Sequence, residues 1–309
     1  MTAELDPDIR IFHARTSADY ARLSDGAPGD LARRRAIAER VRQPWVAGGP
    51  AMAHTETLSV GATRIRIHRP SDAAALPALI YLHGGGWTIF SIDTHDRLMR
   101  EYAARSGCAV VGIDYSLSPE ARFPIALDEV ATVCAWLRDE GHAHGVDPAR
   151  IALGGDSAGG NLALSSALRL RDAGHPAQAL LLNYGAFDTV TRGSHARYDG
   201  DAFMLTSSEM AEFWENYLGP TGAAEDPLAR PLRADLHDLP PTYLCIAECD
   251  ILLDENLEMA KRLRAADVAV DARVYPGATH SFLEAVGISA LADRAIGEAA
   301  CWLRGVLRP

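Results

Sequence analysis

Residues 151–170 read IALGGDSAGGNLALSSALRL: a short apolar run, a turn rich in glycine, and then leucine and alanine at helical spacing. The turn from Gly155 to Gly159 fits the pattern G-x-S-x-G. Alone, the pattern is often only a glycine turn. Between a strand and a helix, it predicts a sharp bend that raises the serine hydroxyl above the end of the strand. We therefore interpret Ser157 as a candidate nucleophile at a helix N-terminus, where free N–H groups favour negative charge.

The same alternation of apolar runs and helical stretches extends through the middle of the chain. The runs are too short for buried helices and end in polar or glycine-rich loops, so they predict strands. The predicted strands are residues 78–82, 109–113, 151–153, 179–182, 242–247 and 272–275, and the predicted helices are 125–138, 162–170 and 256–265. This order predicts an α/β fold with a mostly parallel central sheet flanked by helices, and ligands bound beyond the C-terminal ends of the strands.

Two segments interrupt the alternation. Residues 1 to about 50 read as helical and charged, with 31–42 rich in Ala and Arg, and lead to Pro44 and then to the breaker at 48–50. Aromatic residues are frequent within 187–221, on a predicted helix from about 207 to 218.

Ser207 or Ser208 is the expected N-cap of that second helix. We expect the two segments to form a helical lid over the strand ends, with peripheral packing as the alternative. The expected organisation is an N-terminal cap segment at 1–50 and a catalytic domain at 51–309 that carries a cap insertion at about 187–221.

Composition limits the classes of partner. The 309 residues carry a formal net charge of −11 and contain no long basic run, which argues against nucleic acid and anionic membrane surfaces. The N-terminus lacks a signal-peptide pattern, and no apolar run is long enough to predict a membrane span, so we expect a cytoplasmic protein. The odd number of cysteines and the absence of CxxC argue against a disulfide framework or a zinc site; the cysteines are Cys108, Cys134, Cys245, Cys249 and Cys301.

A candidate base and acid follow Ser157 in the sequence. A serine hydroxyl needs an imidazole to accept its proton, and behind this kind of turn the order is serine, acid, histidine. His280 is the only one of eleven histidines that follows Asp250, and Asp250 ends a predicted strand. We predict His280 as the general base and Asp250 as the acid that orients it, with His237 and Asp254 as weaker alternatives.

The sequence HGGGW at 83–87 follows another predicted strand. Consecutive glycines let backbone N–H groups approach a substrate oxygen, and the N–H after the nucleophile completes such a hole. The predicted oxyanion donors come from Gly84, Gly85, Gly86 and Ala158. The alternative for the glycines is a flexible loop without this role.

Together these motifs resemble the hormone-sensitive-lipase-like (bacterial family IV) esterases over roughly residues 55–305. The matching segments are HGGGW (83–87), DYSLSPEARFPIALDE (114–129), GGDSAGGNLAL (154–164), AECDILLDE (247–255) and ATHSF (278–282). The resemblance implies an α/β-hydrolase core, a helical cap and hydrolysis of short-chain carboxylic esters without a cofactor. It assigns the triad to Ser157, Asp250 and His280.

The chain departs from the family pattern at YSLSPE, DIL and HSF, where the family usually has YRLAPE, DPL and HGF. None of these departures removes a catalytic group. Trp87, Phe203 and Trp214 are candidate substrate-binding residues, and cap packing would explain them equally well.

We therefore expect a serine esterase that forms an acyl-enzyme intermediate with a small-molecule ester and uses no metal. An amidase, a lactonase or an acyltransferase would use the same triad. A hydrolase-like receptor is disfavoured because the chain retains His280. The sequence leaves the oligomeric state open, with a homodimer among the states considered.

Overall fold

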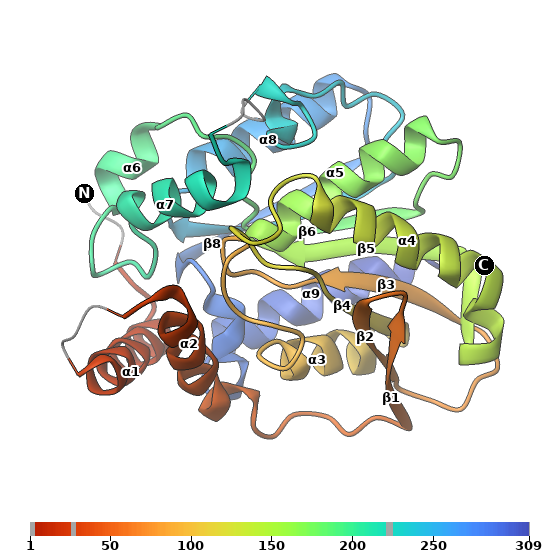
Figure 1. The fold of residues 1–309 in the computed structure, drawn as a ribbon, viewed down its shortest axis with the longest axis horizontal. Coiled ribbons are helices and arrows are strands. Elements are labelled where there is room, and N and C mark those ends of the chain that lie inside the picture. The colour runs from red at the N-terminus through yellow and green to blue at the C-terminus, as the bar shows by residue number, and fades with distance from the viewer. Residues whose placement is uncertain (1–3, 26–28, 221–224, 309) are drawn as a thin grey trace.

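The computed structural model describes residues 4–25, 29–220 and 225–308 and is built on one eight-stranded sheet (Figure 1). The strand order is β1-β2-β4-β3-β5-β6-β7-β8. Neighbours from β4 to β8 pair in parallel, whereas β2 is antiparallel to both of its neighbours, which confirms the mostly parallel sheet. The strands are β1 His54–Val60, β2 Thr63–Arg69, β3 Leu76–Leu82, β4 Ala109–Asp114, β5 Val146–Asp156, β6 Ala179–Asn183, β7 Thr242–Cys249 and β8 Val270–Thr279.

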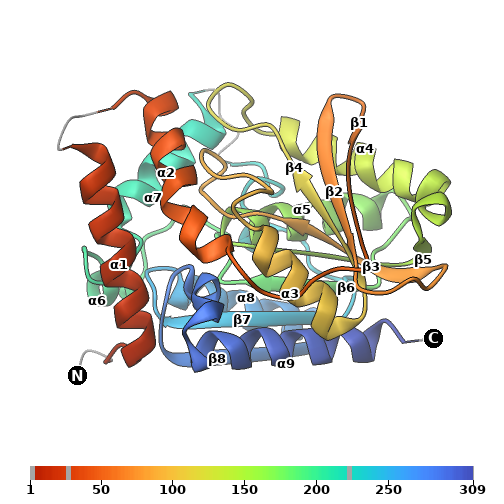
Figure 2. The ribbon, with the colours of Figure 1, turned by 90° about the horizontal axis from the view of Figure 1, so that it is seen from below.

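Helices cover both faces of the sheet (Figures 1 and 2). Alternate residues of β3 point to opposite faces, so Ile80 and Leu82 join one core cluster while Leu79 and Tyr81 join the other. Strands buried on both faces must be apolar throughout, and every residue of β6 is buried. The first cluster lies under α4 (Ile125–Glu140), α5 (Ala158–Asp172) and α8 (Leu253–Ala265), and the second under α3 (Asp96–Ser106) and α9 (Ala290–Val306).

Four further helices gather at one end of the molecule, although they come from two distant parts of the chain (Figure 2). They are α1 (Pro7–Ser24), α2 (Leu31–Val46), α6 (Gly193–Tyr198) and α7 (Ser207–Leu218). Helices α1 and α2 contact each other, and α1 also contacts the short helix η4 (Phe282–Gly287). An ion pair joins the two parts, since Arg34 Nη2 of α2 donates to Glu212 Oε2 of α7 at 3.1 Å.

The helix boundaries correct two expectations. Helix α7 is capped by Thr206, not by Ser207 or Ser208: the Thr206 hydroxyl accepts the Glu209 N–H at 3.2 Å, and the Glu209 carboxylate accepts the Thr206 N–H at 3.0 Å. This reciprocal pair is a capping box, which satisfies two backbone donors at once.

Pro44 lies inside α2, which continues to Val46 before the chain turns at Gly48 and Gly49. The sequence prediction also omitted β1, β2, α3 and α9. Strands β1 and β2 read HTETLSV and TRIRIHR, so they lack the apolar run by which the inner strands were identified.

No helix in the described ranges combines the length and the apolar composition that a membrane span requires. All five cysteines are unpaired thiols. Four of them are buried, and Cys301 is exposed on α9.

Helix α5 approaches β3 so closely that only glycine fits at the contact. A Cβ atom added to Gly159 would lie 1.9 Å from the carbonyl oxygen of Leu82. That oxygen belongs to the backbone of an inner strand and has no rotamer by which to move away. The position of α5, and therefore of the turn that precedes it, depends on the absence of a Cβ atom at Gly159.

Replacing Gly159 by alanine should lower the free energy of unfolding by about 3 kcal/mol, the upper end of typical overpacking, because the clash is with backbone. Urea denaturation measures the loss. Gly305→Ala is the matched control, because Gly305 is exposed on α9 with no atom within 4 Å of the added Cβ. Alanine there should stabilise by up to about 1 kcal/mol through helix propensity. Equal stability of the two variants would contradict the packing argument.

Candidate active site

Ser157 occupies the turn between β5 and α5. Its backbone has φ 55° and ψ −118°, a region that side chains rarely adopt, so the turn holds the residue in a strained conformation. The Ser157 N–H donates to the carbonyl of Asn183 on the neighbouring strand at 2.9 Å, which helps to hold this conformation. The hydroxyl is therefore presented at the C-terminal end of the sheet.

The structure brings the three predicted triad side chains together. The Ser157 Oγ lies 2.9 Å from Nε2 of His280, and Nδ1 of the same ring lies 2.7 Å from Oδ2 of Asp250. Asp250 follows β7 and His280 follows β8, so parallel strands deliver both to one edge. A proton on Nδ1 would be donated to the carboxylate and would leave Nε2 free to accept the serine proton.

Asp250 is 1% exposed, and its second oxygen is also engaged. Oδ1 accepts the N–H of Leu252 at 3.0 Å, which fixes the carboxylate from the side opposite the imidazole. Because both of its oxygens are engaged, the carboxylate of Asp250 has a fixed orientation. It therefore holds the ring of His280 in one orientation as well.

The alternative base and acids have other partners. His237 is exposed, with Nδ1 2.6 Å from Oδ1 of Asp235. Asp254 accepts the Ser194 N–H at 2.7 Å.

Glu255 accepts the Phe187 N–H at 2.7 Å, and burial raises the pKa of this carboxyl to about 8. Asp254 and Glu255 lie in the first turn of α8, and their side chains bond to residues in the 187–197 region.

The glycine loop after β3 contributes fewer free amides than the sequence suggested. The N–H of Gly84 donates to Oδ1 of Asp156 at 3.1 Å, so Gly84 is removed from the predicted oxyanion donors. Within the described part of the chain, the amides of Gly85 and Gly86 donate no hydrogen bond. Ala158 is the first residue of α5, where an N–H has no acceptor within the helix.

Gly86 could not be replaced without rearrangement. It has φ +56°, and an added Cβ would lie 2.1 Å from the ring of Phe213 on α7. The loop thus approaches α7 closely at Gly86.

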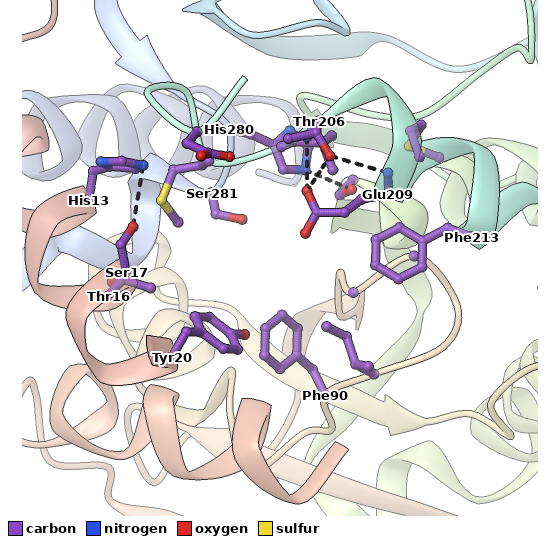
Figure 3. A pocket seen from close by; sticks show the side chains of 18 of the residues that line it. His13, Thr16, Ser17, Tyr20, Phe90, Thr206, Glu209, Phe213, His280 and Ser281 are labelled. Carbon is purple, nitrogen blue, oxygen red and sulfur yellow. Dashed lines mark hydrogen bonds between the residues drawn. The ribbon is translucent and has the colours of Figure 1, made fainter. Parts of the chain in front are cut away.

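Ser157 and His280 open into a cavity of about 480 Å³. Figure 3 shows His13, Ser17 and Tyr20 of α1 on one side of this space and Glu209 and Phe213 of α7 on the other. Its apolar lining includes Phe90, Met204, Leu205 and Met210. Both distant helical segments therefore supply walls to one pocket above the serine.

Trp87, Phe203 and Trp214 do not line this cavity, contrary to their predicted role. Trp87 is 1% exposed and stacks on Tyr217 at 4.2 Å between ring centroids, with Trp214 at 4.5 Å. Phe203 packs edge-on against Tyr198.

The aromatic residues that do line the cavity are Tyr20, Phe90 and Phe213, which the sequence analysis missed. Residues 213 and 214 are neighbours on α7, and about 100° of rotation per residue places one toward the cavity and the next toward the core. The frequency of aromatic residues indicated that this segment takes part in the site. It did not indicate which side of α7 faces the cavity.

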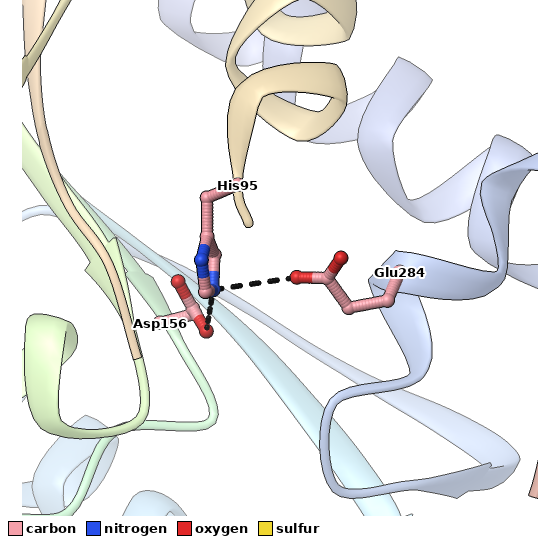
Figure 4. A group of neighbouring side chains, drawn as sticks. All are labelled: His95, Asp156 and Glu284. Atoms are coloured by element: carbon pink, nitrogen blue, oxygen red, sulfur yellow. Dashed lines mark ion pairs between the residues drawn. The ribbon is translucent and has the colours of Figure 1, made fainter. Parts of the chain in front are cut away.

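Side chains of types that can bind metals gather at one place among the described residues: His95, Asp156 and Glu284, all buried (Figure 4), with Asp156 directly before Ser157 in the sequence. His95 already forms an ion pair with each of the two carboxylates. His144 places Nδ1 2.8 Å from Oε1 of Glu56.

Comparison with known proteins agrees with this geometry. A family model described as the alpha/beta hydrolase fold matches residues 79–284, more than half of the chain. A hyperthermophilic esterase from the archaeon Pyrobaculum calidifontis is 33% identical, with 98% of each chain covered and a TM-score of 0.91. A thermophilic and thermostable carboxylesterase cloned from a metagenomic library is 32% identical over 91% of this chain and 99% of that one, with a TM-score of 0.87.

An esterase from the bacterial hormone-sensitive lipase family is 28% identical over 98% of this chain and 99% of that one, with a TM-score of 0.85. These matches confirm the resemblance found in the sequence motifs. The protein is therefore a member of the α/β-hydrolase family, within the hormone-sensitive-lipase-like group of serine esterases.

Proposed function

We propose that the protein hydrolyses short-chain carboxylic esters through an acyl-enzyme intermediate on Ser157. The observation that carries this proposal is the line of hydrogen bonds from Asp250 through His280 to the Ser157 hydroxyl, at 2.7 and 2.9 Å. The titles of the similar structures, which name esterases, point to the same class of substrate.

In the first half-reaction, Ser157 Oγ attacks the ester carbonyl carbon while Nε2 of His280 takes the hydroxyl proton. Asp250 stabilises the imidazolium that forms and does not itself take the proton. The carbonyl oxygen becomes an oxyanion, for which the unused amides of Gly85, Gly86 and Ala158 are the donors. His280 then protonates the leaving alcohol as the tetrahedral intermediate collapses.

In the second half-reaction, water replaces the alcohol. His280 accepts a proton from the water as its oxygen attacks the acyl carbonyl, and the same amides hold the second oxyanion. Collapse returns the proton from His280 to Ser157 Oγ and releases the carboxylic acid. Besides the ester and water, both halves use only the triad side chains and the backbone amides named above.

The two helical segments act in this proposal as a cap on the catalytic domain. Of the predicted cap, residues within 13–42 and 200–213 line the cavity, and the rest of the predicted catalytic domain supplies the sheet and the catalytic loops. A cavity of about 480 Å³ is within the usual size of small-ligand sites. Phe213 narrows it beside Gly86 and would limit the length of the chain that fits.

Ser157→Ala should lower turnover of a nitrophenyl ester by roughly four to six orders of magnitude, because no other group supplies the nucleophile. Steady-state kinetics and labelling by a fluorophosphonate probe measure the effect. Ser281→Ala is a useful control, since Ser281 also lines the cavity but accepts no bond from His280 among the described contacts. Retained activity in the Ser157 variant would refute the nucleophile.

The kcat/KM of the wild-type protein should rise as the pH increases from the acidic side. Only a neutral His280 can accept the Ser157 proton, so protonation at low pH removes the base. A pH–rate profile on an ester whose own hydrolysis is slow checks this. A flat profile from about pH 5 to 9 would contradict the assignment.

Among nitrophenyl esters, acetate, butyrate and hexanoate should be better substrates than laurate. Methylenes beyond the cavity stay in water and forfeit about 0.8 kcal/mol each. Phe213→Ala should move the preference toward longer chains. Trp214→Phe is the matched control, because Trp214 faces the core and should leave the chain-length profile unchanged. Equal kcat/KM for laurate and butyrate in the wild type would contradict the short-chain proposal.

A further inference from the structure

Four ionisable side chains lie buried together behind Ser157, and the proposed mechanism uses none of them. They are Arg42 on α2, His95 before α3, Asp156 at the end of β5 and Glu284 on η4, exposed by 4, 1, 2 and 5% respectively. Buried charges are costly unless they are paired. A cost of this kind is expected where the buried charges serve the adjacent site.

His95 is the centre of the group (Figure 4). Its Nε2 lies 3.4 Å from Oδ2 of Asp156 and 3.4 Å from Oε1 of Glu284. The second oxygen of Glu284 lies 3.6 Å from Nη1 of Arg42. One imidazole nitrogen therefore faces two carboxylates.

The other nitrogen of His95 also faces acceptors. Nδ1 lies 2.9 Å from Thr94 Oγ1 and 3.4 Å from the carbonyl oxygen of Ser91. The Thr94 hydroxyl already donates its proton to that carbonyl at 2.8 Å, so toward His95 it can only accept. With acceptors at both nitrogens, the ring fits its site as a doubly protonated imidazolium.

Asp156 connects this imidazolium to the reacting groups. Its Oδ1 accepts the Gly84 N–H at 3.1 Å and the Tyr81 hydroxyl at 2.9 Å, and Ser157 is the next residue in the chain. Glu284, the second carboxylate at the same imidazole nitrogen, lies four residues after His280. Through Asp156 and Glu284, His95 is therefore linked to the three loops that carry the predicted catalytic groups.

We propose that His95, as an imidazolium, is a positioning residue for the oxyanion loop. It fixes the carboxylate of Asp156, which holds the Gly84 amide and thereby aims the amides of Gly85 and Gly86. Arg42 balances the second carboxylate and fastens cap helix α2 to the same network. This inference rests on the proposed function, because it assumes that these amides bind an oxyanion.

The charged groups around His95 set the pH range of this device. Asp156 faces it from β5, Glu284 from η4, Arg42 and Glu39 from α2, and His83 from the glycine loop. Burial alone would lower the pKa of His95, but the two carboxylates outweigh burial and raise it. Burial and the charge on His95 together lower the pKa of His83 to about 4.

Deprotonation of His95 at high pH should weaken its hold on Asp156. The charge on His95 is present below its raised pKa and is lost as pH rises through it. Asp156 then loses its partner while two carboxylates remain beside one guanidinium. Activity should therefore decline on the alkaline side as the loop loses its support.

His95, Asp156 and Glu284 each offer one atom that could bind a cation, and these three atoms lie within 4.8 Å of one another. Arg42 already supplies positive charge there, and Oδ1 of Asp156 is engaged by two donors. Ion pairing within the chain thus accounts for the cluster, and a chelator distinguishes the two explanations.

The test compares His95→Gln, Glu284→Gln and a control, His68→Gln. His68 is also 1% exposed, with Nε2 3.2 Å from Oδ1 of Asp96, but it lies on β2 away from the catalytic loops. His95→Gln should lower kcat by about 10- to 100-fold with KM within about threefold, because the oxyanion forms only in the transition state. It should also abolish the alkaline decline.

Glu284→Gln keeps His95 but removes one of the charges that raise its pKa, so the alkaline decline should move to lower pH. This variant decides the question if His95→Gln fails to fold, which circular dichroism and thermal unfolding report. His68→Gln should keep both kcat and the pH profile of the wild type, whatever its loss of stability.

A wild-type kcat and an unchanged alkaline decline in His95→Gln would overturn the inference, as would an unmoved decline in Glu284→Gln. Loss of activity on treatment with EDTA, restored by zinc, would replace it with a metal site. Ser157→Ala separates the two levels of the argument. If that variant stays active, the proposed function fails; if it is inactive while His95→Gln is normal, only the positioning role fails.

Discussion

The hydrogen bond between His280 Nε2 and Ser157 Oγ joins residues 123 positions apart, and the rest of the architecture serves to make it 2.9 Å long. Strands β5 and β8 are separated in the sheet by β6 and β7. Their loops can meet only because all four strands are parallel and end at the same edge. Asp250, at the end of the strand between, closes the remaining distance by holding the far side of the imidazole. A sheet with one of these strands reversed would carry the same residues and lack the contact.

Holding this contact costs stability that the surrounding structure must offset. Ser157 has a strained backbone, and four ionisable groups are buried behind it. The close approach of α5 to β3 fixes the strained turn from one side, and the bond from Asp156 to the Gly84 amide fixes the glycine loop from the other. Stability is thus concentrated in apolar packing on both faces of the sheet, which supports a polar and locally unfavourable edge.

Sequence alone gave the fold class and the residues of the hydrogen-bonded line, because both depend on local signals. Inner strands are apolar runs, and the serine, acid and histidine follow their strands in a fixed order. The sequence did not show that the Gly84 N–H is already engaged. Its acceptor Asp156 is 72 residues away, and an aspartate is equally suited to face solvent. It also chose Trp214 where Phe213 lines the cavity, because composition names a helix but not which side of it meets a gap in the core. Strands β1 and β2 escaped prediction because neither contains a continuous apolar run: β1 is an edge strand, and β2 alternates isoleucine with charged residues.

The cavity and the buried charges share structure, which links substrate binding to the geometry of the site. Arg42 and Phe90 both line the cavity, and the guanidinium of Arg42 lies 4.6 Å from the centre of the Phe90 ring. The same guanidinium pairs with Glu284, which pairs with His95. A substrate that presses on this wall therefore acts on a side chain whose other end belongs to the charge network behind Ser157. Because packed interiors transmit displacement instead of absorbing it, the proposed mechanism makes the N-terminal helices part of the catalytic apparatus and not a detachable cover.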